Sequence, residues 1–317
     1  MSRFKEDIAN IPKIPAQIID LKRFSEPDDK QWSCFNPSIG RSPKNQYAIA
    51  FRSSNYVILE PHGELHVTNG GKIKNRVYFS EIDSGYKLLN FRRIEVPDEV
   101  CVTPRGIEDP RLFWRNNAWH FTGTMMEEHT PVARVCVCRL DAKAEKVVDV
   151  EIMGGVQPGK PEKSWLVPDF KSNRNFDFIY GAHAIVKANK VIYTMNDHPL
   201  SDGLRGNSHL IEQKDGTYIT IMHKLWTKTT RGYSPNVFGV VEGLDKNYSH
   251  YFVRFNRHGE LIEMSKGFKF ISPGIEFVGG MVEKDDTFVI SFGKKDVSSH
   301  LAVVPREIVV KSMKPLV

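Results

Sequence analysis

The stretch EDPRLFWRNNAWHFTGTM, from Glu108 to Met125, holds two apolar-rich runs on either side of a polar turn centred on Asn116. Two short apolar runs joined by a tight polar turn are typical of a β-hairpin. Four further segments share this layout, with turns centred on Lys44, Asn173, Asp215 and Asp285: FNPSIGRSPKNQYAIAFRSS, SWLVPDFKSNRNFDFIYGAH, NSHLIEQKDGTYITIMHK and FVGGMVEKDDTFVISFGKKD. The hairpin is therefore a unit that the chain repeats five times.

The distance between successive turns leaves room for two more strands in each unit, for which RVYFSEI, ARVCVCRL, KVIYTMN, HYFVRFN and HLAVVP are candidates. Four-stranded units repeated around an axis make a β-propeller, which leaves only short, protected sheet edges. We therefore predict an all-β protein with a five-bladed β-propeller over residues 32–317. Residues 1–31 are expected to form a lead-in that packs on the propeller or closes its ring. A β-sandwich is the alternative, because alternating strands alone do not separate the two folds.

The repeated hairpins also predict a site. In an antiparallel hairpin, the first strand begins at the edge where the second strand ends. If the hairpins are the inner strand pairs of the blades, polar residues at these ends converge on one mouth of the channel. At the strand starts lie Asn36, Glu108, Asp109, Lys163, Trp165, Arg205, Asn207 and Glu276, and at the strand ends lie Arg52, His183, His223 and Asp296. This set predicts a ring of carboxylates, cations, imidazoles and one indole around a pocket.

The composition suits a globular protein with a substantial core, since 40% of the 317 residues are hydrophobic and 11% are aromatic. No stretch approaches the roughly 18 consecutive apolar residues that a membrane span needs. The first residues, MSRFKEDIANIPK, lack the apolar region of a secretory signal, and the four cysteines have neither zinc-type spacing nor the pattern of a disulfide framework. We expect a cytoplasmic protein that does not enter a membrane.

The net charge of +6 is compatible with an anionic partner. The charges are mixed along the chain, which favours a solvated surface over a nucleic-acid groove. The sequence contains no HExxH motif, no Walker-type phosphate loop and no histidines with metal-ligand spacing, so we predict no metal site.

Five motifs in order resemble the five-bladed propellers of carbohydrate-active enzymes, above all glycoside hydrolase family 130, the β-mannoside phosphorylases and related mannosidases and transferases. EDPR is the most recognisable motif of that family, and FNPSI followed by AFR resembles its first-blade pattern. EKSWLVPDF, LRGNSHLI and GIEFVGGM followed by SFGKKD are similar to an outlying branch, some members of which are joined to glycosyltransferases. The resemblance covers about residues 32–310. It implies an enzyme that makes or breaks glycosidic bonds, on β-mannosides in many members, by an inverting mechanism.

The resemblance places the family's general acid at Asp109, with Asp296 or Glu276 as a second carboxylate. Glycoside chemistry needs a proton delivered to, or removed from, the bridging oxygen. Sugar recognition falls to Asn36, Arg52, Glu108, Arg111, Lys163, Trp165, His183, Arg205, Asn207 and His223. Arg111 is equally suited to brace Asp109, and Trp165 to pack between blades. Three of the set, Lys163, Arg205 and His223, suit inorganic phosphate or a sugar nucleotide as co-substrate, and no cofactor is required.

One feature departs from the phosphorylases. Residues 142–159 contain no arginine, so the family's arginine-rich phosphate-binding stretch has no clear counterpart. Three functions therefore stay open: a phosphorylase or transferase, an inverting hydrolase using the same pocket, and a non-catalytic glycan-binding propeller that serves a separate glycosyltransferase. The expected ligand is an oligosaccharide or a sugar phosphate, and the expected protein partner is a second copy of the chain or a glycosyltransferase.

Overall fold

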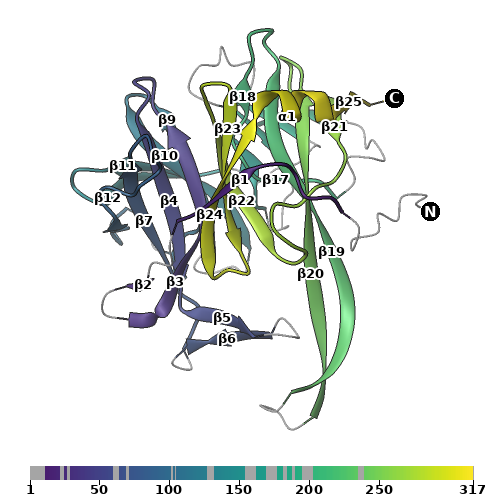
Figure 1. Cartoon of the computed structure of the whole chain (residues 1–317). Helices are drawn as coiled ribbons and strands as arrows, with labels where there is room; N and C mark the ends of the chain where they lie inside the picture. The colour runs from purple at the N-terminus through teal and green to yellow at the C-terminus, as the bar shows by residue number, and fades with distance from the viewer. Residues whose placement is uncertain are drawn as a thin grey trace.

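The computed structural model describes the following residues: 11–21, 25–26, 29–59, 64–68, 71–100, 103, 105–126, 132–153, 162–168, 177–180, 184–187, 190–194, 203–234 and 239–316. Within them, five antiparallel sheets form the blades of a five-bladed β-propeller (Figure 1). The predicted fold class is confirmed.

The first two blades follow the chain. Blade 1 contains β2 (Ser25–Glu26), β3 (Asp29–Arg41), β4 (Tyr47–Ser54), β7 (Asn75–Ile82) and β8 (Arg92–Ile94), in that order across the sheet. A separate hairpin extends from it, made of β5 (Tyr56–Leu59) and β6 (Glu64–Val67). Blade 2 contains β9 (Glu108–Arg115), β10 (Ala118–Met126), β11 (Ala133–Asp141) and β12 (Lys146–Ile152).

The next two blades are built in the same way. Blade 3 contains β13 (Trp165–Leu166), β14 (Phe178–Tyr180), β15 (Ala184–Lys187) and β16 (Lys190–Thr194). Blade 4 contains β17 (Arg205–Gly206), β18 (Ile211–Glu212), β19 (Tyr218–Ser234), β20 (Gly239–Phe255) and β21 (Leu261–Ser265). The C-terminal strand β25 (Met313–Pro315), which follows the helix α1 (Arg306–Ser312), pairs with the outer edge of blade 4.

Blade 5 combines three strands from late in the chain with one strand from early in it. It contains β22 (Glu276–Lys284), β23 (Thr287–Lys294) and β24 (Ser298–Pro305), and its fourth strand is β1 (Gln17–Asp20). Strand β1 pairs antiparallel with β24, from Gln17 opposite Val303 to Asp20 opposite His300. The ladder between β1 and β24 ties an early segment of the chain to its last blade.

Five separate apolar clusters lie between the blades, and each one fills a single interface. One joins blades 1 and 2, and the others join blades 2 and 3, 3 and 4, 4 and 5, and 5 and 1. A β-sandwich would have a single core between two sheets. The closed ring of interfaces is what distinguishes a propeller from that alternative.

Strand β4 shows why its sequence suits a blade. Successive side chains of a strand point to opposite faces of the sheet. Ala48 and Ala50 pack against blade 2, whereas Ile49 and Phe51 pack against blade 5. A strand buried on both faces needs this nearly continuous apolar run.

The predicted hairpin turns are present at Lys44, Asn116, Asp215 and Asp285, while the turn at Asn173 lies outside the described residues. The candidate KVIYTMN provides the fourth strand of blade 3, because Ala184–Lys187 occupies the third place. Strands β19 and β20 are longer than the sequence pattern predicts. They pair from Tyr218 opposite Phe255 to Ser234 opposite Gly239 and form a long arm (Figure 1).

Glycines allow blades 5 and 1 to approach closely. A Cβ atom at Gly279 would lie 2.3 Å from the carbonyl oxygen of Pro37, and one at Gly293 would lie 2.3 Å from Oδ1 of Asn36. The glycines of FVGG and SFGKKD therefore bring blade 5 against Asn36 and Pro37 of β3, where the candidate site lies.

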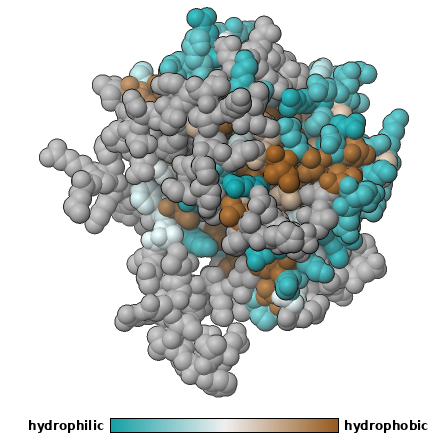
Figure 2. All heavy atoms as spheres, turned by 180° about the vertical axis from the view of Figure 1, so that it is seen from behind, coloured by the Kyte–Doolittle hydropathy of each residue, from teal (hydrophilic) through white to brown (hydrophobic). Residues whose placement is uncertain are grey.

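The surface shows no concentration of the large apolar side chains exposed in the described part of the chain. Those four residues, Ile18, Leu89, Ile152 and Val310, come from different elements. On the face opposite to the view of Figure 1, Figure 2 shows several separate areas of apolar residues, the most extended of them bordered by polar residues. No described helix is long and apolar enough to cross a membrane.

Candidate active site

Two inner strands share the same irregularity. Asn36, inside β3, and Asp109, at the start of β9, have φ values of 48° and 49°, each is followed by proline, and the pairing register shifts beside each of them. Asparagine and aspartate tolerate this left-handed conformation better than most residues. A bulge in a strand redirects the side chain there. Asn36 and Asp109 are thereby turned toward each other at the end of the propeller where β9 begins, which we call the mouth face.

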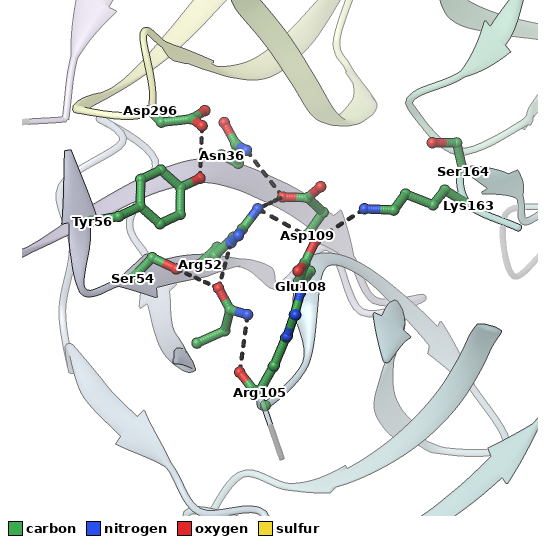
Figure 3. A network of polar contacts seen from close by, with 12 residues as sticks. Asn36, Arg52, Ser54, Tyr56, Arg105, Glu108, Asp109, Lys163, Ser164 and Asp296 are labelled. Carbon is green, nitrogen blue, oxygen red and sulfur yellow. Dashed lines mark hydrogen bonds and ion pairs between the residues drawn. The ribbon is translucent and has the colours of Figure 1, made fainter. Parts of the chain in front are cut away.

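The two side chains meet in a buried polar network (Figure 3). Asn36 donates a hydrogen bond from Nδ2 to Oδ1 of Asp109 at 3.0 Å. Arg52, at the end of β4, donates from Nη1 to the same oxygen at 3.1 Å. Asn36 and Arg52 are only 4% and 7% exposed. The sequence placed these three residues together, and the structure brings them into contact.

Arg52 is held on several sides. Its Nη1 lies 3.8 Å from Oε2 of Glu108, and its guanidinium carbon lies 5.3 Å and 5.5 Å from the ring centroids of Phe35 and Tyr56. Its Nε donates to Oδ1 of Asn75 at 2.9 Å. A planar fork of donors fixed by stacking presents its remaining N–H groups in a defined direction.

Asn75 is a residue that the sequence pattern did not reveal. Its Oδ1 also accepts from the Ser54 hydroxyl, and its Nδ2 donates to the Arg105 carbonyl at 3.0 Å. Asn75 begins the third strand of blade 1, opposite Ser54 in β4. The mouth-face ends of third strands were not part of the predicted ring, although the same antiparallel rule applies to them.

Asp296 approaches the network from blade 5. It lies after β23 in a turn where its φ is 53°, and its Oδ2 accepts a hydrogen bond of 2.8 Å from the Tyr56 hydroxyl. Tyr56 begins the extra hairpin of blade 1 and was also missed from the sequence, because nothing local distinguishes it from other aromatic strand residues. Figure 3 shows Asp296 and Asp109 on two sides of Asn36.

The surroundings shift the pKa values of Asp109 and Asp296 in opposite directions. Burial alone would raise the pKa of Asp109, but the nearby charges of Arg52, Arg111 and Lys163 and the hydrogen bond from Asn36 together lower it. Burial raises the pKa of Asp296, and the negative charge of Asp109 adds to this rise, against the opposing effects of Arg52 and Tyr56. At neutral pH Asp109 is therefore ionised, and Asp296 holds a proton more readily than an ordinary aspartate.

The other half of the mouth face is built around Arg111 on β9. Its Nε donates to the Asn207 carbonyl at 2.8 Å, and its Nη2 donates to Oγ of Ser164 at 3.2 Å. The side chain is 3% exposed and lies 5.4 Å from the Phe277 ring centroid. Arg111 therefore contacts blades 3, 4 and 5 from blade 2. Of its two expected roles, this geometry favours a brace.

His223 and Asn207 form a second buried pair. Nδ1 of His223 lies 2.6 Å from Oδ1 of Asn207, so this nitrogen donates and carries the proton. Burial, with the charges of Arg205 and Arg111, lowers the pKa of His223 well below its usual value. The ring of Tyr248, another residue that the sequence did not reveal, lies 4.8 Å from the His223 ring. A neutral imidazole carries no positive charge with which to attract an anion.

Two cationic side chains, Lys163 and Arg205, lie at the exposed edge of the mouth face, which we call the rim. Lys163 donates from Nζ to Oε2 of Glu108 at 3.1 Å, and half of its side chain is exposed. Arg205 is exposed and pairs with His223 across β17 and β19. Both side chains are accessible to an anionic group.

Three predicted site residues lie elsewhere or cannot be placed. Trp165 is 1% exposed and packs between blades 2 and 3, at 5.5 Å between its ring centroid and that of Phe178. Glu276 is fully buried, and its carboxylate accepts hydrogen bonds from the backbone N–H groups of residues 270, 271 and 272. This geometry favours a structural role for Glu276. His183 lies outside the described residues.

The described part of the chain contains no group of three or more histidine, cysteine or acidic residues arranged to hold a metal ion. The site contains two aspartates whose pKa values are shifted in opposite directions, the fixed side chain of Arg52, and the accessible cations Lys163 and Arg205. Such an arrangement can orient hydroxyl groups, move a proton and attract an anion.

Comparison with known proteins gives the fold. No family model matches the chain, and neither does any curated protein. Among solved structures, the β-1,2-mannobiose phosphorylase from Listeria innocua, in complex with β-1,2-mannobiose, is similar with a TM-score of 0.58 and 12% identity over 98% of each chain. MPT-1, a GDP-Man-dependent mannosyltransferase from Leishmania mexicana, is similar with a TM-score of 0.57 and 12% identity over 91% of this chain and 90% of its own.

MPT-4, a mannose phosphorylase from Leishmania mexicana in complex with phosphate ion, has a TM-score of 0.51 and 11% identity over 93% of this chain and 92% of its own. The predicted resemblance is confirmed at the level of the fold, which these proteins share with this chain along nearly their whole length.

Proposed function

We propose that the chain is a carbohydrate-active enzyme that forms a glycosidic bond by inverting transfer. The donor is a sugar with an anionic leaving group, a sugar phosphate or a sugar nucleotide, and the acceptor is a hydroxyl group of a second sugar. One observation carries the proposal: Asp109 is held ionised by Arg52 and Asn36 at the mouth face. An ionised carboxylate is a general base, ready to take the proton of an acceptor hydroxyl.

The acceptor oxygen attacks the anomeric carbon and forms the new C–O bond, while the bond from that carbon to the leaving-group oxygen breaks with inversion. The hydroxyl proton passes to Asp109, directly or through a neighbouring sugar hydroxyl. The leaving group departs as an anion, which the accessible cations Lys163 and Arg205 stabilise by charge-assisted hydrogen bonds.

The comparisons support this chemistry because proteins described as mannoside phosphorylases and as a GDP-Man-dependent mannosyltransferase share the fold. Phosphorolysis is the same step in reverse, and it requires a protonated Asp109, as the sequence resemblance implied. In the ligand-free protein Asp109 is in the ionised form that the transfer direction needs.

A second function rests on the raised pKa of Asp296. A carboxyl group that keeps its proton can protonate a leaving oxygen, as a glycoside hydrolase requires. In that case Asp296 is the acid and Asp109, being ionised, activates water. A glycosidase described as acting on β-1,2-mannosidic linkages shares the fold, at 15% identity with a TM-score of 0.55.

A product screen separates these functions. The purified protein is incubated with hexose 1-phosphates, sugar nucleotides and β-linked manno-oligosaccharides, each with and without inorganic phosphate. Transfer predicts oligosaccharide formation together with release of phosphate or nucleotide. Sugar release from oligosaccharides without phosphate would instead indicate hydrolysis. Saturable sugar binding with no product from any donor would contradict an enzyme and indicate a glycan-binding propeller.

The variants Asp109→Asn and Asp296→Asn then test the roles. If Asp109 is the base, Asp109→Asn lowers kcat by about 10²–10⁴-fold at a temperature where the variant remains folded, although the loss of the ion pair with Arg52 lowers its melting temperature. The matched control is Asp215→Asn, the same change at an exposed turn residue. Full activity of Asp109→Asn on the validated substrates would show that the base is wrongly assigned.

A further inference from the structure

A cavity of about 380 Å³ lies outside the network just described, between blade 1 and the segment that precedes β9. Its wall contains four cationic side chains, Lys74, Arg76, Arg93 and Arg105, but only one carboxylate, Asp98. The cations come from three separate parts of the chain: the start of β7, the strand β8, and the loop before β9. The fold therefore gathers positive charge around one hollow, and none of the functions considered above uses it.

The charge of this cavity is available to a ligand. Lys74, Arg93 and Arg105 are exposed, and within the described residues no carboxylate lies within ion-pair distance of any of the three. Cations clustered in a concave site raise the local concentration of anions. The three exposed cations Lys74, Arg93 and Arg105 are therefore expected to attract an anion.

Side-chain stacking and hydrogen bonds hold the wall of the cavity in place. The guanidinium carbon of Arg76 lies 3.7 Å from the ring centroid of Trp32, which is 5% exposed. A cation stacked on a buried indole is held in place. The loop that carries Arg105 is fixed by Asn75, whose backbone N–H and side-chain Nδ2 both donate to the Arg105 carbonyl, at 2.7 Å and 3.0 Å.

Gly106 completes this wall. Its φ is 74°, and a Cβ atom there would lie 2.2 Å from the Asn75 carbonyl oxygen. The loop can approach β7 this closely only with glycine at that position. The same Asn75 accepts the hydrogen bond from Arg52, so one side chain separates this cavity from the carboxylate network.

We propose that this cavity, lined by Lys74, Arg76, Arg93 and Arg105 beside Trp32, binds the phosphate group of a small phosphorylated metabolite. Arginine presents a fork of donors that matches phosphate oxygens, and three arginines with one lysine suit a dianion. The volume lies at the small end of the range for small-molecule sites and admits a phosphate with one attached ring. The site is distinct from Lys163 and Arg205 at the rim and does not depend on the proposed transfer reaction.

The test measures binding, not activity. Isothermal titration calorimetry with inorganic phosphate, a hexose 1-phosphate and a nucleoside diphosphate is run at constant ionic strength, with chloride as the reference anion. Four proteins are compared: the wild type, Arg93→Gln/Arg105→Gln in the cavity, Lys163→Gln/Arg205→Gln at the rim, and the control Arg139→Gln/Lys143→Gln. The control removes two exposed cations from blade 2 outside both sites. Because Arg105 anchors Asn75 through its backbone, its side chain can be changed without losing the anchor.

We expect the cavity variant to weaken binding of at least one phosphorylated metabolite by about tenfold or more, because charge-assisted contacts are lost. The rim variant and the control should keep this binding component. Binding in the cavity should also change the fluorescence of Trp32, which stacks on Arg76, and Trp32→Phe should remove this change. The proposal is overturned if the cavity variant binds phosphorylated metabolites as the wild type does, or if only the rim variant loses binding. It is also overturned if chloride competes equally at the same ionic strength, or if neither metabolite binds more tightly than inorganic phosphate.

Discussion

Two buried arginines of the mouth face, Arg52 and Arg111, differ in what surrounds them. Arg52 contacts the carboxylate of Asp109 and lies near that of Glu108, whereas Arg111 donates to a backbone carbonyl and a serine hydroxyl. Burial lowers the pKa of both, but for Arg52 the surrounding acidic groups outweigh burial and raise it. For Arg111 burial prevails and the pKa falls to about 10, despite the charge of Asp109.

The difference separates a charge that the site needs from a side chain that holds blades together. The charge of Arg52 keeps Asp109 ionised, so it acts on the chemistry through its partner. The charge of Arg111 is costly where it lies, and what the fold uses is its length and its directed N–H groups. Methionine has a similar length and no charge, so the same substitution at both positions can test the distinction.

The largest effect is expected from Arg52→Met. Removing one partner of a buried ion pair leaves the other uncompensated, which costs about 3–5 kcal/mol. Asp109 would lose the charge that lowers its pKa most, so its pKa should rise and the acidic limb of the kcat profile, where the base becomes protonated, should move to higher pH. Urea unfolding measures the stability, and the pH dependence of kcat measures the position of this limb.

The double variant Arg52→Met/Asp109→Asn is the control for this change. Because it removes both charges, it should recover part of the lost stability. The double-mutant cycle should give a coupling energy of about 0.5–3 kcal/mol, the range for residues in contact. Additive losses would show that the two residues do not act as an ion pair.

His209 extends the comparison to the side of Arg111. It is buried beside the backbone of Arg111 and Met281, and burial together with the Arg111 charge lowers its pKa to about 4. A histidine whose folded pKa lies below its unfolded value contributes stability that is fully present above about pH 6.5 and is lost as the pH falls toward the folded pKa. The free energy of unfolding should therefore decrease on acidification through this window, by on the order of 3 kcal/mol from His209 alone.

The variant His209→Gln should remove that part of the pH dependence, as measured by urea unfolding at several pH values between 4 and 7. His258→Gln, at an exposed turn, is the matched control and should leave the slope unchanged. Identical slopes for His209→Gln and the wild type would show that His209 does not stay neutral in the folded protein.

Arg111→Met is expected to cost less than Arg52→Met, about 1–3 kcal/mol, because it removes the donor to the Asn207 carbonyl and the Ser164 hydroxyl but also removes a charge that burial disfavours. It should also raise the pKa of His209, since the Arg111 charge depresses it. Unfolding measurements and titration of the His209 ring by NMR check the two effects. A loss equal to that of Arg52→Met would remove the distinction between the two arginines.

The sequence predicted the repeating hairpin, the five blades and the meeting of Asn36, Arg52 and Asp109, because strand ends follow from local patterns and antiparallel geometry. It could not predict Asn75 or Tyr56, since their roles depend on contacts between strands far apart in the chain. Arg111 was left between two roles because its partners, Asn207 and Ser164, lie in other blades.

Glu276 shows the opposite limit. Its position at the start of an inner strand is equivalent to that of other site residues, yet its carboxylate is engaged by three backbone N–H groups of the preceding loop. The sequence pattern predicted where Glu276 lies along its strand, but it could not predict the direction of its side chain. The long arm of β19 and β20 was missed for a related reason, because the outer residues of these strands, such as WTKTTRGYS, lack an apolar face.

The smallest effect is expected from Tyr56→Phe, which tests the proton of Asp296 directly. The Tyr56 hydroxyl donates to Asp296 and lowers its pKa, so its removal should raise that pKa further. If a reaction step needs the protonated form of Asp296, activity falls as the pH rises through this pKa, and the alkaline limb of the kcat profile should move to higher pH in Tyr56→Phe. The cost in stability should be about 1 kcal/mol, because one hydrogen bond is lost. Tyr248→Phe is the matched control, since this half-buried ring lies at the same site and, within the described residues, no hydrogen bond joins its hydroxyl to Asp296. A limb that stays in place in Tyr56→Phe, or moves equally in both variants, would show that Asp296 does not hold the proton that the reaction uses.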